Sequence, residues 1–411
     1  MAIMDVNKLL DFGVRQEASD LILKAGQPPI FRIHGDLVRM KVDTMTADEV
    51  KQSTYAILSD AQIEKFEREW ELDYAYEIAD LARFRGNIMV QRGRVSAVWR
   101  TIPLTIQTME ALGLPEICRK LSDYPRGLVL VTGPTGSGKT TTLAAMIDYI
   151  NKNKPLHIMT VEDPVEYVHP CRKALINQRE VGHDTLSFAD ALKFVLRQDP
   201  DVILIGEMRD LETIHNAITA AETGHLVFGT LHTTDAVQTV DRIIDVFPPH
   251  QQQQVRMQLS VNLVGVLSQA LVKTRNLSGR VAAFETMEAI PAIRNLIREG
   301  KTHQIASTIQ TGSRQGMFSL NQALATLVAR GIADEDSARS KCTALEEFDE
   351  LVAEGQEMEG ATTLQEGGPR TATAEAREVA QKADFRRRLQ ERRGGGGPEG
   401  QDGGAGSGSG G

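Results

Sequence analysis

Cysteine is scarce in this sequence: Cys118, Cys171 and Cys342 are the three among 411 residues. They lie far apart and include no Cys-x-x-Cys pair, so they do not supply the ligand set of a structural zinc site. A disulfide framework is excluded on the same ground, and this cysteine usage is typical of a reducing compartment.

Long apolar runs are also missing. No stretch approaches the ~20 consecutive apolar residues that a membrane-spanning helix needs. Residues 1–20 carry charges early and lack the apolar block of a secretory signal peptide. We therefore expect a cytoplasmic protein.

The chain has no excess of positive charge. Its 46 Lys and Arg residues are outnumbered by 55 Asp and Glu residues, which gives a net charge of −9. Because nucleic-acid phosphates are bound by clustered Lys and Arg, we expect no nucleic acid as the main partner. With 41% hydrophobic and 25% charged residues, the composition is that of a globular chain with room for two or three domains.

A phosphate-binding loop is the strongest motif in the sequence. Residues 133–140 read GPTGSGKT, after an apolar run at 128–131 and before a segment with helical spacing of apolar residues. This is the pattern G-x-x-x-x-G-K-[ST] in the strand-before, helix-after context that gives it meaning, and its glycines let backbone N–H groups converge on phosphate oxygens. Lys139 is expected to reach the β- and γ-phosphates, and the Thr140 hydroxyl to complete the shell of a Mg²⁺ ion. The predicted nucleotide-binding residues are Gly133, Pro134, Thr135, Gly136, Ser137, Gly138, Lys139, Thr140 and Thr141.

Acidic residues end two further apolar runs. Four such runs recur between helical patterns, which predicts a parallel sheet covered on both faces; they are 127–133, 157–163, 201–207 and 225–231. Ligands gather at the carboxyl ends of such strands. Glu162 is the predicted general base, and Glu207 a Walker-B-like carboxylate that contacts magnesium through water or polarises the attacking water. For Asp163 the choice stays open between capping the turn at Pro164, tuning Glu162 and pairing with an arginine.

Two histidines, His225 and His232, flank the last of these runs. Their odd separation would place them on opposite faces of a regular strand, unless Gly229 marks a bulge. A histidine can hydrogen-bond a phosphate, but one at a strand end can equally be structural. The spacing alone leaves both readings open.

Residues 1–115 predict a separate small α/β domain. The expected elements are a helix at 6–14, a hairpin at 30–40, two helices within 46–70 with an N-cap near Ser59, and a second hairpin at 82–103. Arginines alternate along the second hairpin, while Val95, Ala97 and Trp99 alternate toward its other side; they are Arg83, Arg85, Arg92, Arg94 and Arg100. They form either a solvated face or arginine fingers against the phosphates of a neighbouring subunit.

Four segments together resemble the boxes of the secretion and pilus motor ATPases. GPTGSGKT, TVEDPVEYVH, LRQDPDVILIGEMRDLETI and AAETGHLVFGTLHT are similar, in order, to the Walker A, Asp, Walker B and His boxes. Within that superfamily AIRNLIREG, at 292–300, resembles the signature of the PilT-type twitching-motility ATPases, which drive type IV pilus retraction. The likeness runs from residue 1 to about residue 340.

This resemblance implies an α/β fold with a RecA-like motor domain. The implied division is an N-terminal PAS-like domain at 1–115, a RecA-like P-loop ATPase core at 116–290, a helical C-terminal module at 291–350 and a flexible low-complexity tail at 351–411. It also implies that the AIRNLIREG segment couples hydrolysis to motion.

The resemblance further implies an ATP-hydrolysing homohexamer with Mg²⁺, bound peripherally to the inner membrane at the pilus base. Its implied partner is a PilC-like platform protein, with paralogous pilus ATPases as further candidates. The implied catalytic residues are Glu162, Glu207, Lys139, His225 and His232, with Arg83 and Arg100 acting across the subunit interface, and the implied metal contacts are Thr140 and Glu207.

Three alternatives remain. GHDT at 182–185 resembles the accessory PilU-type retraction ATPase. A pilus assembly or type II secretion ATPase usually carries a four-cysteine zinc module, which three scattered cysteines cannot build. A nucleotide-gated binding protein or a nucleic-acid translocase has the same core, but the acidic composition speaks against the translocase.

Overall fold

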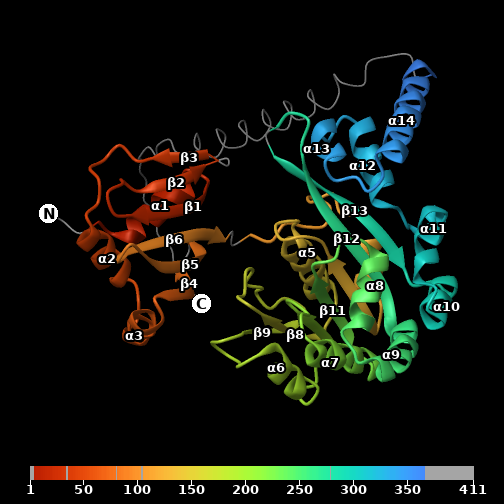
Figure 1. The fold of residues 1–411 in the computed structure, drawn as a ribbon, viewed down its shortest axis with the longest axis horizontal. Coiled ribbons are helices and arrows are strands. Elements are labelled where there is room, and N and C mark those ends of the chain that lie inside the picture. The colour runs from red at the N-terminus through yellow and green to blue at the C-terminus, as the bar shows by residue number, and fades with distance from the viewer. Residues whose placement is uncertain (1–3, 34–35, 80, 103–104, 278, 366–411) are drawn as a thin grey trace, which may run out of the picture. The chain divides into compact units, whose positions relative to one another are not determined.

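The structure is a computed structural model that describes residues 4–365 apart from 34–35, 80, 103–104 and 278 (Figure 1). Met1–Ala353 forms one compact unit. The predicted flexible tail, 351–411, lies outside the described residues from residue 366 on.

The first half of this unit contains a six-stranded antiparallel sheet in the order β3-β2-β1-β6-β5-β4 (Figure 1). Its strands are β1 (Ala18–Lys24), β2 (Ile30–Ile33), β3 (Asp36–Arg39), β4 (Glu71–Ile78), β5 (Ala82–Gln91) and β6 (Arg94–Ile102). Its helices are α1 (Val6–Arg15), α2 (Ala47–Tyr55) and α3 (Asp60–Glu69). The predicted helices and hairpins are confirmed, and Ser59 caps α3 by accepting a hydrogen bond from the Gln62 backbone N–H.

The two faces of this sheet differ as the alternation predicted. Phe84, Ala97 and Trp99 are fully buried against the three helices. The Trp99 indole donates to the Tyr74 hydroxyl at 2.8 Å, and the Tyr74 ring lies over Gly86, where an added Cβ would come within 2.5 Å of it. The arginines of β5 and β6 therefore lie on the opposite, open face.

A second sheet has seven strands in the order β13-β12-β7-β11-β10-β8-β9. All neighbours pair in parallel except β12 and β13, which are antiparallel. The strands are β7 (Gly127–Thr132), β8 (His157–Glu162), β9 (Leu175–Glu180), β10 (Val202–Ile205), β11 (Leu226–Leu231), β12 (Leu263–Lys273) and β13 (Arg280–Glu288). The four predicted parallel runs are β7, β8, β10 and β11, and the α/β fold class is confirmed; the predicted domain boundaries stay predictions.

Helices cover both faces of the second sheet, which is why its central strands read as unbroken apolar runs. Leu128 and Leu130 of β7 face one core, whereas Val129 and Val131 face the other. The helices of this region are α4 (Ile117–Ser122), α5 (Lys139–Asn153), α6 (Phe188–Val195), α7 (Leu211–Glu222), α8 (Ala236–Asp245) and α9 (Pro249–Asn262).

Helical elements follow β13. They are α10 (Pro291–Glu299), η1 (Thr302–Gln304), α11 (Ile305–Gln310), η2 (Ser313–Gln315), α12 (Leu320–Ala329), α13 (Glu335–Arg339) and α14 (Leu345–Gln365). Within the described ranges, no helix combines the length and apolar content that crossing a bilayer requires.

Helix α10 holds the AIRNLIREG segment and ends at Gly300, which has a left-handed φ of 70°. Ile293 and Ile297 are fully buried, as the spacing predicted. Arg294 lies half-buried, and its Nε donates to the Ala289 carbonyl at 2.6 Å. Its Nη1 donates to the Ser260 carbonyl, at 3.2 Å, and to the Val261 carbonyl. These last two carbonyls belong to the end of α9, so Arg294 ties the two helices together.

We predict that Arg294→Met lowers the free energy of unfolding by about 1–3 kcal/mol, because buried carbonyls lose a charged donor. Urea unfolding of the nucleotide-free chain measures it. Arg298→Met is the matched control: this exposed side chain on the same helix contacts only Asn295, at 3.1 Å, and its loss should change stability by less than about 0.5 kcal/mol. Equal effects of the two variants would contradict the structural role of Arg294.

Candidate active site

The phosphate loop joins the end of β7 to the start of α5 and is shaped by glycine. Gly133, Gly136 and Gly138 have φ values of 140°, 78° and 91°, in the region that favours glycine. A Cβ on Gly133 would lie 2.4 Å from the Gln269 carbonyl oxygen, and one on Gly138 would lie 2.8 Å from the Gln269 side-chain nitrogen. Gln269, on β12, also accepts a hydrogen bond from the Thr142 hydroxyl at 2.8 Å. It therefore packs against the loop and is bonded to the helix that follows the loop.

A cavity of about 450 Å³ opens over this loop. Its size is in the range of small-molecule sites. The loop contributes Thr135, Gly136, Gly138, Lys139, Thr140 and Thr141 to the wall, and the ends of the strands contribute Glu162, Glu207 and His232. The structure thus brings together residues that lie far apart in the sequence.

Lys139 begins α5 and folds back over the loop. Its Nζ donates to the carbonyl oxygens of Gly133, at 2.8 Å, and Pro134, at 3.2 Å. Burial lowers the pKa of Lys139, and the negative charges of Glu207 and Glu166 oppose that shift. A partly desolvated ammonium held at a loop of backbone N–H groups is suited to an anionic ligand.

Glu162 ends β8 and is buried, with 6% of its surface exposed. Its Oε1 accepts hydrogen bonds from the Thr160 hydroxyl at 2.7 Å and from Gln178 Nε2 at 3.1 Å. Burial raises the pKa of Glu162, although these two hydrogen bonds act in the opposite direction. The Glu162 carboxyl is therefore more basic than an exposed one, and the two hydrogen bonds fix its orientation. The next residue, Asp163, is exposed at the rim of the same cavity.

Glu207 lies just beyond β10 and has a different environment. Burial alone would raise its pKa, but a hydrogen bond from Arg209, the charge of that guanidinium and the neighbouring His232 together outweigh burial, so the pKa is lowered. His232 Nε2 lies 2.8 Å from Glu207 Oε1. The two cavity carboxyls consequently shift in opposite directions, which separates a basic one from one that stays ionised.

His225 is not brought to this cavity. It precedes β11, and its carbonyl accepts the Gly127 N–H at 2.9 Å, at the start of β7 rather than at its end. Its Nδ1 bonds the Ala220 carbonyl at 2.9 Å and the Thr223 hydroxyl at 3.2 Å. Because β11 runs without a register shift from one edge of the sheet to the other, the two flanking histidines lie at opposite edges, and Gly229 marks no bulge.

The arginines of the first sheet separate into two groups. Arg85 and Arg100, paired across β5 and β6, line the cavity. Arg100 and Arg32 both form ion pairs with Asp20, at 3.0 and 3.3 Å, and that carboxylate is buried. Arg83 does not line the cavity; it pairs with Glu180 of β9 at 3.0 Å. The structure therefore places Arg100 at the site within its own chain, and Arg85 beside it.

Sequence reasoning missed several residues of this site. Gln178 of β9 bonds Glu162 and also holds the Tyr167 carbonyl, at 2.8 Å, and the His169 N–H, at 2.8 Å. His169 lines the cavity; burial lowers its pKa to about 4, and its Nδ1 has no partner among the described residues. A glutamine on an edge strand carries no chemical signature in sequence, so only the sheet order reveals it.

The residues present fit a nucleotide-bound Mg²⁺. The Thr140 hydroxyl and the Glu207 carboxylate both line the cavity and are the hard oxygen ligands that Mg²⁺ prefers. The described part of the chain contains no cluster of three or more His, Cys, Asp or Glu that could hold a metal alone.

Comparison with known proteins gives one consistent result. Residues 104–366 match the family model described as type II/IV secretion system protein. The chain is 53% identical to the type IV pilus retractation ATPase PilT of Pseudomonas aeruginosa, over 84% of this chain and 100% of the relative. It is 52% identical to a twitching motility protein of Neisseria gonorrhoeae, over 76% and 84%. It is 41% identical to the type IV pilus ATPase PilU of Pseudomonas aeruginosa, over 81% and 88%.

Solved structures agree. The crystal structure of the pilus retraction motor PilT with bound ADP matches with a TM-score of 0.79 and 44% identity, over 84% of this chain and 99% of that one. The Legionella pneumophila ATPase DotB matches with a TM-score of 0.72 and 26% identity, over 82% and 94%.

A partly buried carboxyl on β13, that of Glu285, gives a pH prediction. Glu285 of β13 accepts the Ala236 N–H at 2.7 Å, at the start of the helix that follows His232. Burial raises the pKa of Glu285 to about 7, and Asp235 adds to the shift. Between pH 4.5 and 7 the folded chain therefore holds a proton that the unfolded chain has released, so this contribution to stability is lost as pH rises.

We expect the free energy of unfolding of the wild type to fall, relative to Glu285→Gln, by about 2–3 kcal/mol from pH 5 to pH 8. Urea unfolding over that pH range measures it. Glu346→Gln, an exposed site, should track the wild type. A pH dependence that is the same with and without the Glu285 carboxyl would refute the assignment.

Proposed function

The chain belongs to the type II/IV secretion system protein family, and within it to the PilT group of pilus retraction ATPases, and on this premise we propose that it is an ATP-hydrolysing hexameric motor that powers type IV pilus retraction. The observation that carries the proposal is the single cavity in which Lys139, Glu162 and Glu207 converge with Arg100. A nucleotide-gated binding protein needs a phosphate loop but not a buried, oriented carboxyl facing it.

In this proposal the loop from Gly133 to Thr141 binds the phosphates of ATP. The Lys139 ammonium exchanges its two carbonyl partners for β- and γ-phosphate oxygens. Thr140 and Glu207 would hold the Mg²⁺ that comes with the nucleotide, and the ion would neutralise negative charge on the phosphates. The bound ADP in the matching PilT structure supports this use of the loop.

Glu162 acts as the general base. Its raised pKa lets it accept a proton from water more readily than an exposed carboxylate does, and the bonds from Thr160 and Gln178 orient it. Glu207 stays ionised beside Arg209. His232, which contacts the Glu207 carboxylate, can also hydrogen-bond the phosphates of the nucleotide. His225 has no part in this cavity within one chain, so a role for it requires another subunit.

The arginines stabilise the phosphates when the first sheet closes on a nucleotide. Arg100 is oriented by the buried Asp20, and Arg85 lies next to it. Arg83 acts across the subunit interface only after its ion pair with Glu180 opens. Sequential hydrolysis around the ring would then move a PilC-like platform protein at the inner membrane, where the motor binds peripherally, and depolymerise pilin.

A test of this function is ATP turnover by the purified chain, with particle mass read on the same samples. We expect Mg²⁺-dependent turnover by a ring of about six subunits, with kcat reduced about 10²–10⁴-fold in Glu162→Gln while nucleotide still binds. Lys139→Ala should lose nucleotide affinity, and Glu222→Gln, on the surface of α7, should behave as wild type.

Retraction in cells separates the motor from its accessory relative. Expression in a strain that lacks its own retraction ATPases should restore retraction, measured as twitching. Rescue only when a paralogue is present would replace the proposal with the accessory PilU-like role. The GHDT segment is the sequence feature that favours this alternative. A stable monomer without turnover would reject a motor of either kind.

Gln178 gives a sharper prediction for the same site. Its Nε2 bond lowers the pKa of Glu162, so Gln178→Leu should move the acidic limb of the kcat–pH profile to higher pH and reduce kcat about tenfold or more. KM should change little. Asn177→Leu is the matched control, because Asn177 is the neighbour on β9 and bonds His157 instead. An unshifted pH profile in Gln178→Leu would show that this residue does not position the base.

A further inference from the structure

We propose that the first sheet carries a second anion-binding site, formed by Lys24, Arg92, Arg94 and Ser96, for a phosphate-bearing ligand. It is separate from the nucleotide cavity: its residues come from the end of β1 and from the turn between β5 and β6. They line a cavity of about 350 Å³ together with Ala25 and Gln91. No carboxylate is among its lining residues.

The three cations of this site are unpaired. Within the described ranges, Lys24, Arg92 and Arg94 make no side-chain hydrogen bond and no ion pair. Elsewhere on the same sheet, Arg32 and Arg100 pair with Asp20, and Arg83 pairs with Glu180. Three neighbouring unpaired cations repel one another, which is unexpected in a chain of net charge −9 unless an anion neutralises them.

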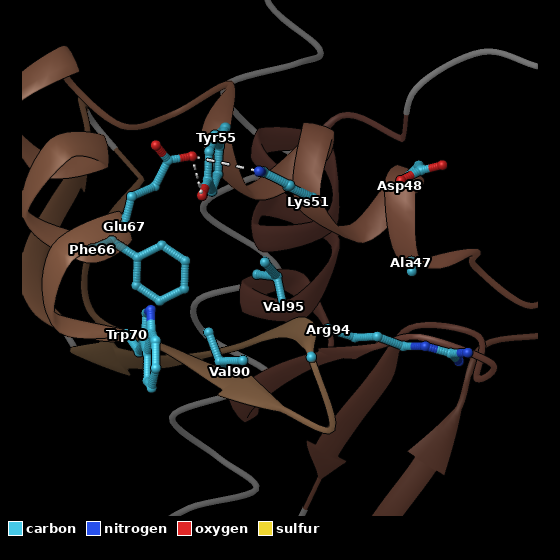
Figure 2. A pocket seen from close by; sticks show the side chains of 11 residues that line it. Ala47, Asp48, Lys51, Tyr55, Phe66, Glu67, Trp70, Val90, Arg94 and Val95 are labelled. Atoms are coloured by element: carbon cyan, nitrogen blue, oxygen red, sulfur yellow. Dashed lines mark hydrogen bonds and ion pairs between the residues drawn. The ribbon is translucent and has the colours of Figure 1, made fainter.

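Neighbouring carboxylates do not neutralise these three cations. Arg94 also lines the adjoining pocket, drawn in Figure 2, where its side chain extends away from Glu67. The Glu67 carboxylate is bonded to Lys51, at 3.5 Å, and to the Tyr55 hydroxyl, at 3.3 Å. Asp48, also labelled in Figure 2, forms no ion pair with Arg94. The guanidinium of Arg94 is therefore available to a ligand.

Ser96 adds a hydroxyl donor to the site. It lies opposite Lys24 across the β1–β6 pairing and lines the cavity, and its hydroxyl forms no hydrogen bond with another described residue. A phosphate oxygen would accept from it while the guanidinium groups bind the remaining oxygens in their fork geometry.

The turn between β5 and β6 has a backbone conformation that arginine disfavours. Arg92 and Gly93 form a two-residue connection, and both have left-handed φ values, 51° and 72°. Glycine or asparagine is the residue that such a turn favours at its first position. An arginine at this position costs conformational energy that glycine would not, so its side chain does not serve to form the turn.

The expected ligand is a small molecule that carries a phosphate group, because the volume of the cavity exceeds that of a single phosphate ion. Its source is either a soluble phosphate compound or the head group of an anionic lipid. Both supply the same oxygens, so the experiment has one arm for each source.

The test uses the full chain with Lys139→Ala, to weaken the nucleotide site. Inorganic pyrophosphate is titrated by calorimetry, and vesicles of phosphatidylglycerol in phosphatidylcholine are tested by co-sedimentation. Adding Arg92→Gly and Arg94→Gln should weaken binding to one or both probes at least about tenfold, and added salt should weaken it in the parent. Binding to pyrophosphate alone identifies a soluble ligand; binding to vesicles identifies the lipid.

The matched control removes the same charge elsewhere, with Arg15→Gln and Arg68→Gln, two exposed arginines of the same region. It should bind as the parent does. Arg92→Gly alone should weaken binding while leaving the melting temperature unchanged or raised, which a merely structural arginine would not do. Equal loss in the two double variants, or no binding of either probe at millimolar concentration, would overturn the proposal.

Discussion

Four neighbouring strands, β7, β8, β10 and β11, are hydrogen-bonded in parallel, so their carboxyl ends all lie at one edge of the sheet. The phosphate loop follows β7, Glu162 ends β8, Glu207 follows β10 and His232 follows β11. The pairing therefore decides which residues meet. The same pairing excludes His225, because the beginning of a parallel strand lies at the other edge.

Burial gives the two cavity carboxyls different chemistry. Both are desolvated, but Glu162 is compensated by neutral donors and Glu207 by cations. The neutral donors orient Glu162 and lower its pKa by less than burial raises it, whereas the groups beside Glu207 stabilise its ionised form enough to outweigh burial. One cavity thus holds a carboxyl with a raised pKa and a carboxyl with a lowered pKa, which is the combination that the proposed hydrolysis mechanism uses.

The first sheet has one face for stability and one for ligands. Trp99, Phe84 and the Tyr74–Gly86 contact fill the covered face. On the open face, the buried Asp20 orients Arg100 at the nucleotide cavity, while Arg94 and Lys24 lie farther along the same strands without partners. Alternation along β6 places Arg94 and Arg100 on the same side of the domain, and the pairing of β1 with β6 places Lys24 opposite Ser96 on that side.

Local patterns with a fixed period or a fixed spacing predict the phosphate loop, the parallel runs, the apolar stripe of α10 and the alternation of β6. The order of the four boxes in the sequence also identifies the family. Contacts that depend on sheet order and register could not be predicted in this way. Gln178 reaches Glu162 only because β9 pairs with β8. Arg294 binds the end of α9 rather than pointing to solvent with Arg298, and Arg83 is held by Glu180 while Arg85 and Arg100 reach the cavity. These contacts join residues from separate elements, and no local periodicity encodes which elements meet.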